Sequence, residues 1–207
     1  MFAPRSGRYL ALGIVGVAAL ALASIVLAPE RFPLTAFAVA ALAAWGFFAT
    51  FFRDPERTVG DGIVAAADGR VLAVTTEGGR VRIAVFMNVT NVHVNRAPLD
   101  GEVTRIERAG EGHRPAYAAD ASHNRRCHYE FATAIGTVEV VQMTGLVARR
   151  LVPLVRVGDT RRRGERFGMI VMGSRVDVLL PDPRVEVVVR ARDRVVAGVT
   201  TIARVRP

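Results

Sequence analysis

The sequence predicts a mainly β fold, a barrel- or sandwich-like domain preceded by an N-terminal hydrophobic helical hairpin. Residues 10–28 and 34–52 are uncharged runs of 19 residues each, near the length of a helix that crosses a bilayer core. After residue 57, short valine-rich runs alternate with Gly- and Asp-containing turn signals, which is typical of β-strands joined by tight turns.

The two uncharged runs predict a membrane hairpin over residues 1–57. Residues 29–33 lie between them and hold two prolines and two charges, so this segment is expected to turn the chain. Arginines flank both outer ends, which predicts that both termini face the cytoplasm. A cleaved signal peptide would not explain the second run. Because both runs are rich in Ala and Gly, the hairpin either spans the bilayer or lies partly in one leaflet.

Residues 58–207 predict the β-rich domain. The clearest alternation places Val176, Val178 and Leu180 on one face of a strand, which indicates burial of that face. Residues 110–126 form the longest stretch without a strand pattern, and they either cover a functional site or form a solvated loop. The expected strands are 70–75, 80–86, 103–107, 129–134, 137–142, 169–172, 176–180, 184–189, 195–199 and 202–205.

The charge of the chain favours an anionic membrane surface as its partner. The net charge is +9, from 28 basic and 19 acidic residues, and every basic residue is an arginine because the chain has no lysine. Such a balance suits nucleic acid or anionic lipid. Only three Tyr and one Trp are present, without the interleaving of aromatic and basic residues that stacks bases, and the N-terminus is hydrophobic. We therefore expect a membrane partner and no nucleic acid.

The single cysteine, Cys127, predicts neither a disulfide nor a metal site. It has no partner for an internal disulfide. Its neighbour His128 does not complete the ligand spacing of a zinc site. We expect Cys127 to be structural and the protein to bind no metal.

The dipeptide Gly173-Ser174 joins two expected strands, and its serine is able to react with the preceding peptide bond. A serine hydroxyl can attack the carbonyl of the preceding residue, and glycine there does not crowd the attack. The resulting ester can eliminate its acyl group and leave a pyruvoyl group after hydrolysis. Taken alone, the dipeptide is far more typical of an ordinary turn or bulge than of this reaction.

Four segments together resemble the phosphatidylserine decarboxylases, specifically their short, membrane-associated type. Gly173 to Asp177 resembles the processing site of that family. Three more segments match in the same order, and the resemblance runs from about Phe51 to Pro181. They are Phe51 to Arg57, Asn91 to Pro98 and Gly145 to Arg150.

The resemblance implies a pyruvoyl-dependent lyase that decarboxylates phosphatidylserine to phosphatidylethanolamine and CO2. It implies autocatalytic cleavage of a zymogen between Gly173 and Ser174, into residues 1–173 and 174–207, which stay associated. Ser174 would become the pyruvoyl cofactor, whose carbonyl accepts electrons as CO2 leaves. A chain without lysine has no residue to hold pyridoxal phosphate, the usual electron sink for this chemistry.

The resemblance also assigns roles to two further residues. His93 lies in the histidine-bearing motif and would activate Ser174 and later protonate the product. Asp68, in an Ala-Asp-Gly segment, would complete an Asp-His-Ser arrangement by orienting the imidazole. Longer relatives carry two histidines near this motif, whereas here only His93 is present.

Several features stay open at the level of sequence. The phosphate or carboxylate of the substrate could be held by an arginine, and Asp177 could instead pair with one. The substrate could be another serine phospholipid such as archaetidylserine, and a non-enzymatic membrane-tethered β domain is the alternative from another class. The location is expected to be the cell membrane with the β domain on the cytoplasmic side, and homo-oligomer formation is left open. The candidate arginines are Arg96, Arg149, Arg150 and Arg175.

Overall fold

A computed structural model describes most of the chain, and the chain divides into two compact units. The units are Met1–Glu56 and Arg57–Pro207. The described residues are 2–3, 7–27, 32–112, 114–117, 123–146, 150–171, 174–181 and 183–206.

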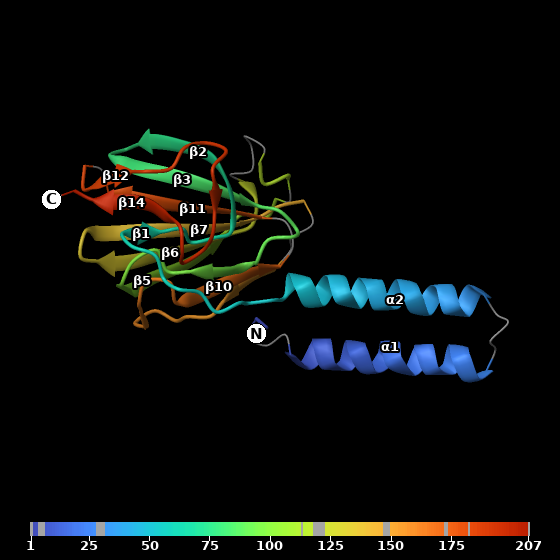
Figure 1. The fold of residues 1–207 in the computed structure, drawn as a ribbon. Helices are drawn as coiled ribbons and strands as arrows, with labels where there is room; N and C mark the ends of the chain where they lie inside the picture. The colour runs from blue at the N-terminus through green and yellow to red at the C-terminus, as the bar shows by residue number, and fades with distance from the viewer. Residues whose placement is uncertain are drawn as a thin grey trace. The chain divides into compact units, whose positions relative to one another are not determined.

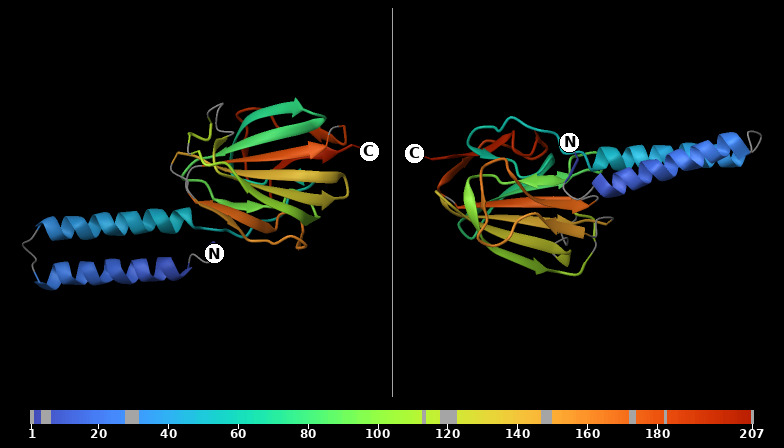
Figure 2. Two further views of the ribbon diagram at one scale, coloured as in Figure 1. Left: turned by 180° about the vertical axis from the view of Figure 1, so that it is seen from behind. Right: turned by 90° about the horizontal axis from the view of Figure 1, so that it is seen from below.

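The first unit consists of two helices that run antiparallel (Figures 1 and 2). These are α1 (Gly7–Leu27) and α2 (Phe32–Phe51), and the indole Nε1 of Trp45 in α2 donates to the carbonyl of Leu10 in α1 at 2.9 Å. The predicted turn falls largely on residues 28–31, which lie outside the described residues. Within the described part of the chain, neither helix combines the length and hydropathy needed to cross a membrane. The prediction of a membrane-spanning hairpin is therefore not confirmed.

The second unit confirms the prediction of a mainly β domain, and its largest sheet curls into a half-barrel (Figure 1). That eight-stranded sheet has the order β13-β2-β3-β11-β7-β6-β5-β9, and two three-stranded sheets have the orders β4-β10-β8 and β1-β14-β12. The strands are β1 (Ile63–Val64), β2 (Gly69–Glu77), β3 (Arg80–Met87), β4 (Val94–Arg96), β5 (Gly101–Ala109), β6 (Arg126–Thr133), β7 (Gly136–Thr144), β8 (Arg150–Pro153), β9 (Thr160–Arg161), β10 (Arg166–Val171), β11 (Ser174–Pro181), β12 (Val185–Val187), β13 (Arg194–Val195) and β14 (Thr201–Val205).

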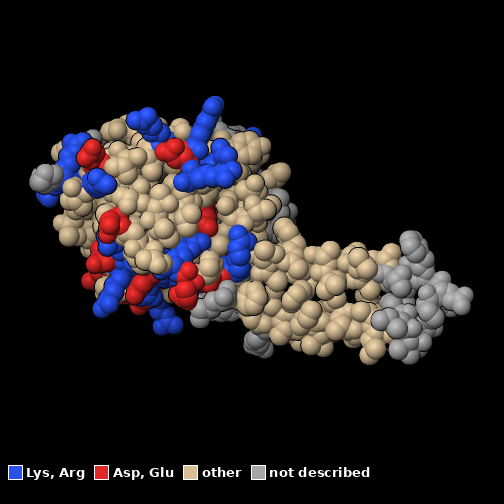
Figure 3. Space-filling model, in the orientation of Figure 1, with Lys and Arg blue, Asp and Glu red and all other residues tan. Residues whose placement is uncertain are grey.

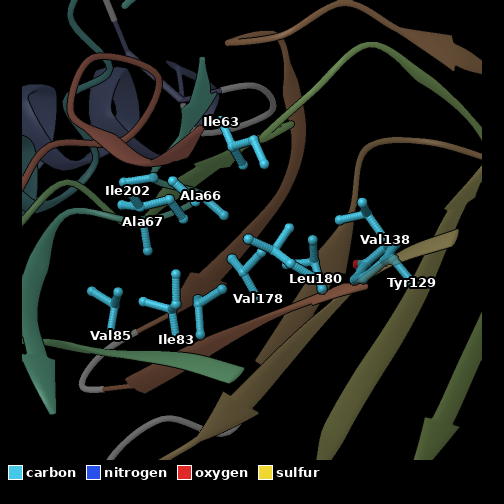
Figure 4. Packing of buried hydrophobic residues seen from close by; sticks show 14 of the residues in the cluster. Ile63, Ala66, Ala67, Ile83, Val85, Tyr129, Val138, Val178, Leu180 and Ile202 are labelled. Carbon is cyan, nitrogen blue, oxygen red and sulfur yellow. The ribbon is translucent and has the colours of Figure 1, made fainter. Parts of the chain in front are cut away.

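The core lies against one face of the large sheet, and the predicted face of β11 contributes to it. Val176, Val178 and Leu180 are all buried, as their alternation predicted. Figure 4 shows two of them, Val178 and Leu180, beside apolar side chains from β3 and from the β1 and β14 region. Phe167 of β10 packs edge to face on Tyr129 of β6, with ring centroids 4.9 Å apart, so the β4-β10-β8 sheet shares this core.

One expected strand is wrong. Residues 195–199 were expected to form a strand, but β13 ends at Val195 and a turn follows. The amide of Val196 donates to the hydroxyl of Thr200 at 2.9 Å, and Gly198 has a φ of 75°, in the left-handed region. The side-chain hydrogen bond and the glycine together favour a turn over an extended segment.

Candidate functional site

Ser174 is the first residue of β11 and lies between two neighbouring strands. Its register partners are Met87, the last residue of β3, and Thr144, the last residue of β7. The residue is fully buried, and its hydroxyl donates to the sulfur Sδ of Met87 at 3.3 Å. Its predicted cleavage partner, Gly173, lies outside the described residues. The strand pairing therefore fixes the backbone of Ser174 from both sides.

His93 is fully buried in the segment between β3 and β4. Its ring nitrogen Nδ1 lies 2.9 Å from the carbonyl oxygen of Asn91. Because a carbonyl only accepts, Nδ1 carries the hydrogen, and in a neutral ring this leaves the lone pair on Nε2. The carbonyl of His93 accepts from the amide of Ile170 at 3.1 Å, which ties its backbone to β10, the strand that precedes Ser174. Such a tautomer suits a general base acting through Nε2.

Asp68 directly precedes β2 and is held in a buried ion pair. Its carboxylate accepts two hydrogen bonds from Arg57, at 2.6 Å and 2.9 Å, and a third from the amide of Ala197 at 2.8 Å. This bidentate geometry gives the carboxylate a fixed orientation. The structure thus ties Asp68 to Arg57 and Ala197, and the orientation of His93 by Asp68 stays a prediction.

The glycine after Asp68 has a clear structural reason. Gly69 has a φ of 154°, and a Cβ there would lie 2.0 Å from the carbonyl oxygen of Phe86 in β3. Only glycine permits this approach of the two backbones. The Asp-Gly pair therefore reflects the packing of β2 on β3 as well as any chemical role of the aspartate.

The candidate arginines differ in their surroundings. Arg96 is buried and donates from Nη1 to the carbonyl of Gly164 at 2.9 Å. Arg175 donates to both carboxylate oxygens of Asp177, at 2.6 Å and 2.7 Å, so the pairing of Asp177 with an arginine is confirmed. Burial raises the pKa of Asp177, and the neighbouring Arg175 opposes that rise. Arg150 is exposed at the start of β8, and Arg149 lies outside the described residues.

The long loop predicted over residues 110–126 is anchored beside the site. The side-chain amide of Asn124 donates to the carbonyl of Thr144 and to that of Arg114, each at 2.7 Å, and its oxygen accepts from the amide of Arg114 at 2.8 Å. Since Thr144 is the register neighbour of Ser174, Asn124 fastens the loop next to the candidate site. Residues 113 and 118–122 of this loop lie outside the described residues.

Three buried residues near Ser174 were missed by sequence reasoning: the methionine Met87 and the two amides Asn95 and Gln142. Asn95 in β4 donates from Nδ2 to the sulfur of Met87 at 3.8 Å and accepts from Nε2 of Gln142 at 2.7 Å. Gln142 in turn accepts from the hydroxyl of Tyr129 at 2.9 Å. The one available signal was a polar residue inside a strand pattern, Gln142 among the valines of β7.

The residues around Ser174 fit a pyruvoyl group made from that serine. The hydroxyl is buried against a thioether, which accepts a hydrogen bond but cannot remove the proton. A buried imidazole in the tautomer of a base belongs to the segment that follows β3, the strand paired with β11. Among the described residues, no group of three His, Cys, Asp or Glu side chains is arranged to hold a metal ion.

Comparison with known proteins gives a consistent result. A family model described as phosphatidylserine decarboxylase matches residues 45–203. A phosphatidylserine decarboxylase proenzyme of Streptomyces avermitilis is 42% identical over 208 residues, covering 98% of this chain and 96% of the relative. One of Streptomyces coelicolor is 47% identical, covering 74% and 71%. A provisionally named archaetidylserine decarboxylase proenzyme of Halobacterium salinarum is 44% identical, covering 92% of each chain.

The buried ion pair of Asp68 leads to a prediction about stability. Arg57→Met should lower the free energy of unfolding by about 3–5 kcal/mol, because it leaves a buried carboxylate without its charged partner. Chemical denaturation in a Ser174→Ala background measures this on an intact chain. The matched control is Arg82→Met, which removes an exposed ion pair to Glu77 and should cost less than about 1 kcal/mol. An equal decrease in the free energy of unfolding in the two variants would show that the Arg57–Asp68 pair stabilises the fold no more than an exposed ion pair does.

Proposed function

The chain belongs to the phosphatidylserine decarboxylase family, and we infer from this membership that it decarboxylates phosphatidylserine to phosphatidylethanolamine and CO2 as a carbon–carbon lyase. The observation that carries the proposal is the family match over residues 45–203, which includes Asp68, His93 and Ser174. Buried Ser174 at the start of a central strand supports it.

A second substrate is favoured by a specific observation. Relatives from Halobacterium salinarum and Methanosarcina barkeri, 44% and 41% identical, carry names that assign archaetidylserine as substrate. The two lipids share the serine head group, on which the reaction takes place. We therefore propose phosphatidylserine as the main substrate and an ether-linked serine phospholipid as the alternative.

We propose that the chain first processes itself, as the proenzyme names of its relatives imply. The Oγ of Ser174 would attack the carbonyl carbon of Gly173, and the peptide bond would break as the acyl group moves from nitrogen to oxygen. His93 would take the hydroxyl proton through Nε2 and return a proton to the leaving nitrogen. The hydrogen bond from Nδ1 to Asn91 supports this role because it fixes the tautomer that the step needs.

Processing would continue by loss of the Cα proton of residue 174 and cleavage of its bond from Cβ to Oγ. The ester oxygen then leaves as the new carboxylate of residues 1–173, and dehydroalanine remains on residues 174–207. One water hydrolyses this end, releases ammonia and yields a pyruvoyl group. The pyruvoyl carbonyl supplies the electron sink for decarboxylation, while His93 would protonate the product carbon.

We propose that Asp68 contributes to processing by positioning. Its three hydrogen bonds to Arg57 and Ala197 hold the segment before β2, and the amide of Arg96 donates to the carbonyl of Ala66 at 2.9 Å. This contact joins the Asp68 segment to β4, the strand that begins directly after His93. Loss of Asp68 would therefore disturb the placement of His93 without removing the base.

The self-processing proposal predicts two fragments in the purified protein. Denaturing electrophoresis should separate residues 1–173 from residues 174–207, and the smaller fragment should be lighter by one ammonia than the unmodified peptide. Ser174→Ala should remain one band and release no CO2 from carboxyl-labelled phosphatidylserine. Parallel assays with archaetidylserine rank the two substrates. A Ser174→Ala protein that is still cut at this bond would refute the proposal, and an uncut, inactive parent would favour a non-enzymatic β domain.

The separate roles of His93 and Asp68 predict different processing rates. His93→Ala should leave the chain uncut or slow cleavage by about 10²–10⁴, because a general base contributes that much. Asp68→Ala should slow cleavage less, since the base remains. A time course after cell-free synthesis measures both. Normal maturation and activity of His93→Ala would make His93 structural and move the search for the base to His113, His123 and His128.

We propose that the helical unit attaches the protein to the cell membrane, with the β unit on the cytoplasmic side. The visible described surface of α1 and α2 is tan in Figure 3, whereas arginines and acidic residues are spread over the visible face of the β unit. A contiguous apolar surface of this kind marks a membrane or protein interaction site. The exposed large apolar side chains of α1 and α2 are Leu12, Val15, Leu22, Phe37, Val39, Leu42, Phe47 and Phe48.

Membrane attachment through apolar side chains predicts resistance to salt. The protein should stay with the membrane fraction after a high-salt wash, because salt screens charge but does not weaken apolar contacts. Sedimentation and immunoblotting measure the distribution. A variant with Val15→Glu, Phe37→Glu and Phe48→Glu should move to the supernatant, whereas Arg→Gln changes on the β unit should not have this effect. Recovery of the parent in the high-salt supernatant would contradict the proposal.

A further inference from the structure

A chain of buried hydrogen bonds ends at the hydroxyl of Ser174. It starts at Tyr129 in β6, passes through Gln142 in β7 and Asn95 in β4, and reaches the sulfur of Met87 in β3. Ser174 donates to the same sulfur at 3.3 Å. The five residues come from five strands, and each is at most 1% exposed. Polar groups so deeply buried are costly unless they are paired, so the arrangement specifies one geometry.

The hydrogen bonds between Tyr129 and Met87 allow only one assignment of donors and acceptors. A thioether has no proton to donate, so Asn95 must present its NH2 group to Met87. Its oxygen then faces Gln142, whose own NH2 group donates to it, and the oxygen of Gln142 accepts from Tyr129. Burial raises the pKa of Tyr129, which keeps the phenol protonated as this donor.

The strand beneath Gln142 is shaped to admit its side chain. Gly168 of β10 faces this amide, and a Cβ at position 168 would lie 2.6 Å from Nε2 of Gln142. The glycine lets the amide pass from the large sheet to Asn95 in the smaller β4-β10-β8 sheet. This series of hydrogen bonds thereby joins β4, which begins directly after His93, to β11, which begins with Ser174.

We propose that Met87 is a positioning residue for self-processing, and that Asn95 and Gln142 hold its thioether where it selects one rotamer of Ser174. The inference rests on the proposed cleavage at Ser174. Intramolecular attack depends steeply on the placement of the nucleophile, and a shift of about 1 Å costs on the order of 10²-fold in rate. A thioether suits this task because it orients the hydroxyl without competing for its proton.

The rival explanation is that Met87 only fills space in the core. Two substitutions separate the explanations because they change packing and acceptor capacity in opposite ways. Met87→Leu keeps an apolar side chain of similar volume but removes the acceptor. Met87→Gln is worse for apolar packing but places an amide oxygen near the position of the sulfur, where it can accept from both Ser174 and Asn95. Met169→Leu is the matched control, since Met169 is also buried but is not one of the five residues that these hydrogen bonds link.

The experiment follows the cleavage of freshly synthesised full-length chains over time, together with the midpoint of thermal unfolding in a Ser174→Ala background. We expect Met87→Leu to slow cleavage by at least about 10-fold. We expect Met87→Gln to be cleaved faster than Met87→Leu although it unfolds at a lower temperature. Met169→Leu should be cleaved at the rate of the parent.

The outcomes are distinct. Cleavage rates that follow stability, with Met87→Leu faster than Met87→Gln, would overturn the inference and make Met87 a packing residue. Parental rates in both variants would overturn it as well. A parent chain that never cleaves would instead refute the proposed self-processing, which the time course of the unsubstituted protein reveals first.

Discussion

The pairing of β11 with both β3 and β7 is the constraint on which the site depends. Every residue of β11 has a register partner in β3, and Ser174 to Leu179 also pair with β7. A strand held on both sides cannot slip by one residue without moving Val176, Val178 and Leu180 out of the core. The position of Ser174 at the beginning of the strand is therefore set by apolar burial far along the same strand. The packing of the apolar core thus determines where the hydroxyl of Ser174 lies.

The same pairing explains how two fragments would remain together after cleavage. Residues 174–207 contain β11 to β14, and three of these strands pair with strands of the preceding part of the chain. β11 lies between β3 and β7, β13 pairs with β2, and β14 pairs with β1. Cutting one peptide bond before β11 leaves these ladders and the shared apolar core intact. The association proposed for the fragments needs no contact beyond those of the uncut fold.

The sequence was sufficient where the signal is local. The period of two in residues 176–180 identified the buried face of β11, because alternation is a property of neighbouring residues. The strand expected at 195–199 failed because a hydrogen bond from Val196 to Thr200 and the left-handed Gly198 favour a turn. The partners of Asp68 were equally hidden, since Ala197 is 129 positions away in the chain. Two apolar runs suggested helices, but their length alone did not decide whether a helix crosses a membrane.

The hydrogen bonds that link Tyr129 to Met87 through two amides show why the rest of the site could not be predicted from the sequence. Asn95 and Gln142 are 47 positions apart, and each taken alone is an ordinary polar residue in a strand. Their meaning comes from the meeting of two sheets, where Gly168 leaves room for one amide to reach the other. Burying unpaired amides would cost free energy, so a polar pair in such a place persists only where the geometry satisfies both partners. For this reason, the hydrogen bonds that connect a buried residue to a reacting hydroxyl are a stronger guide to its function than its residue type.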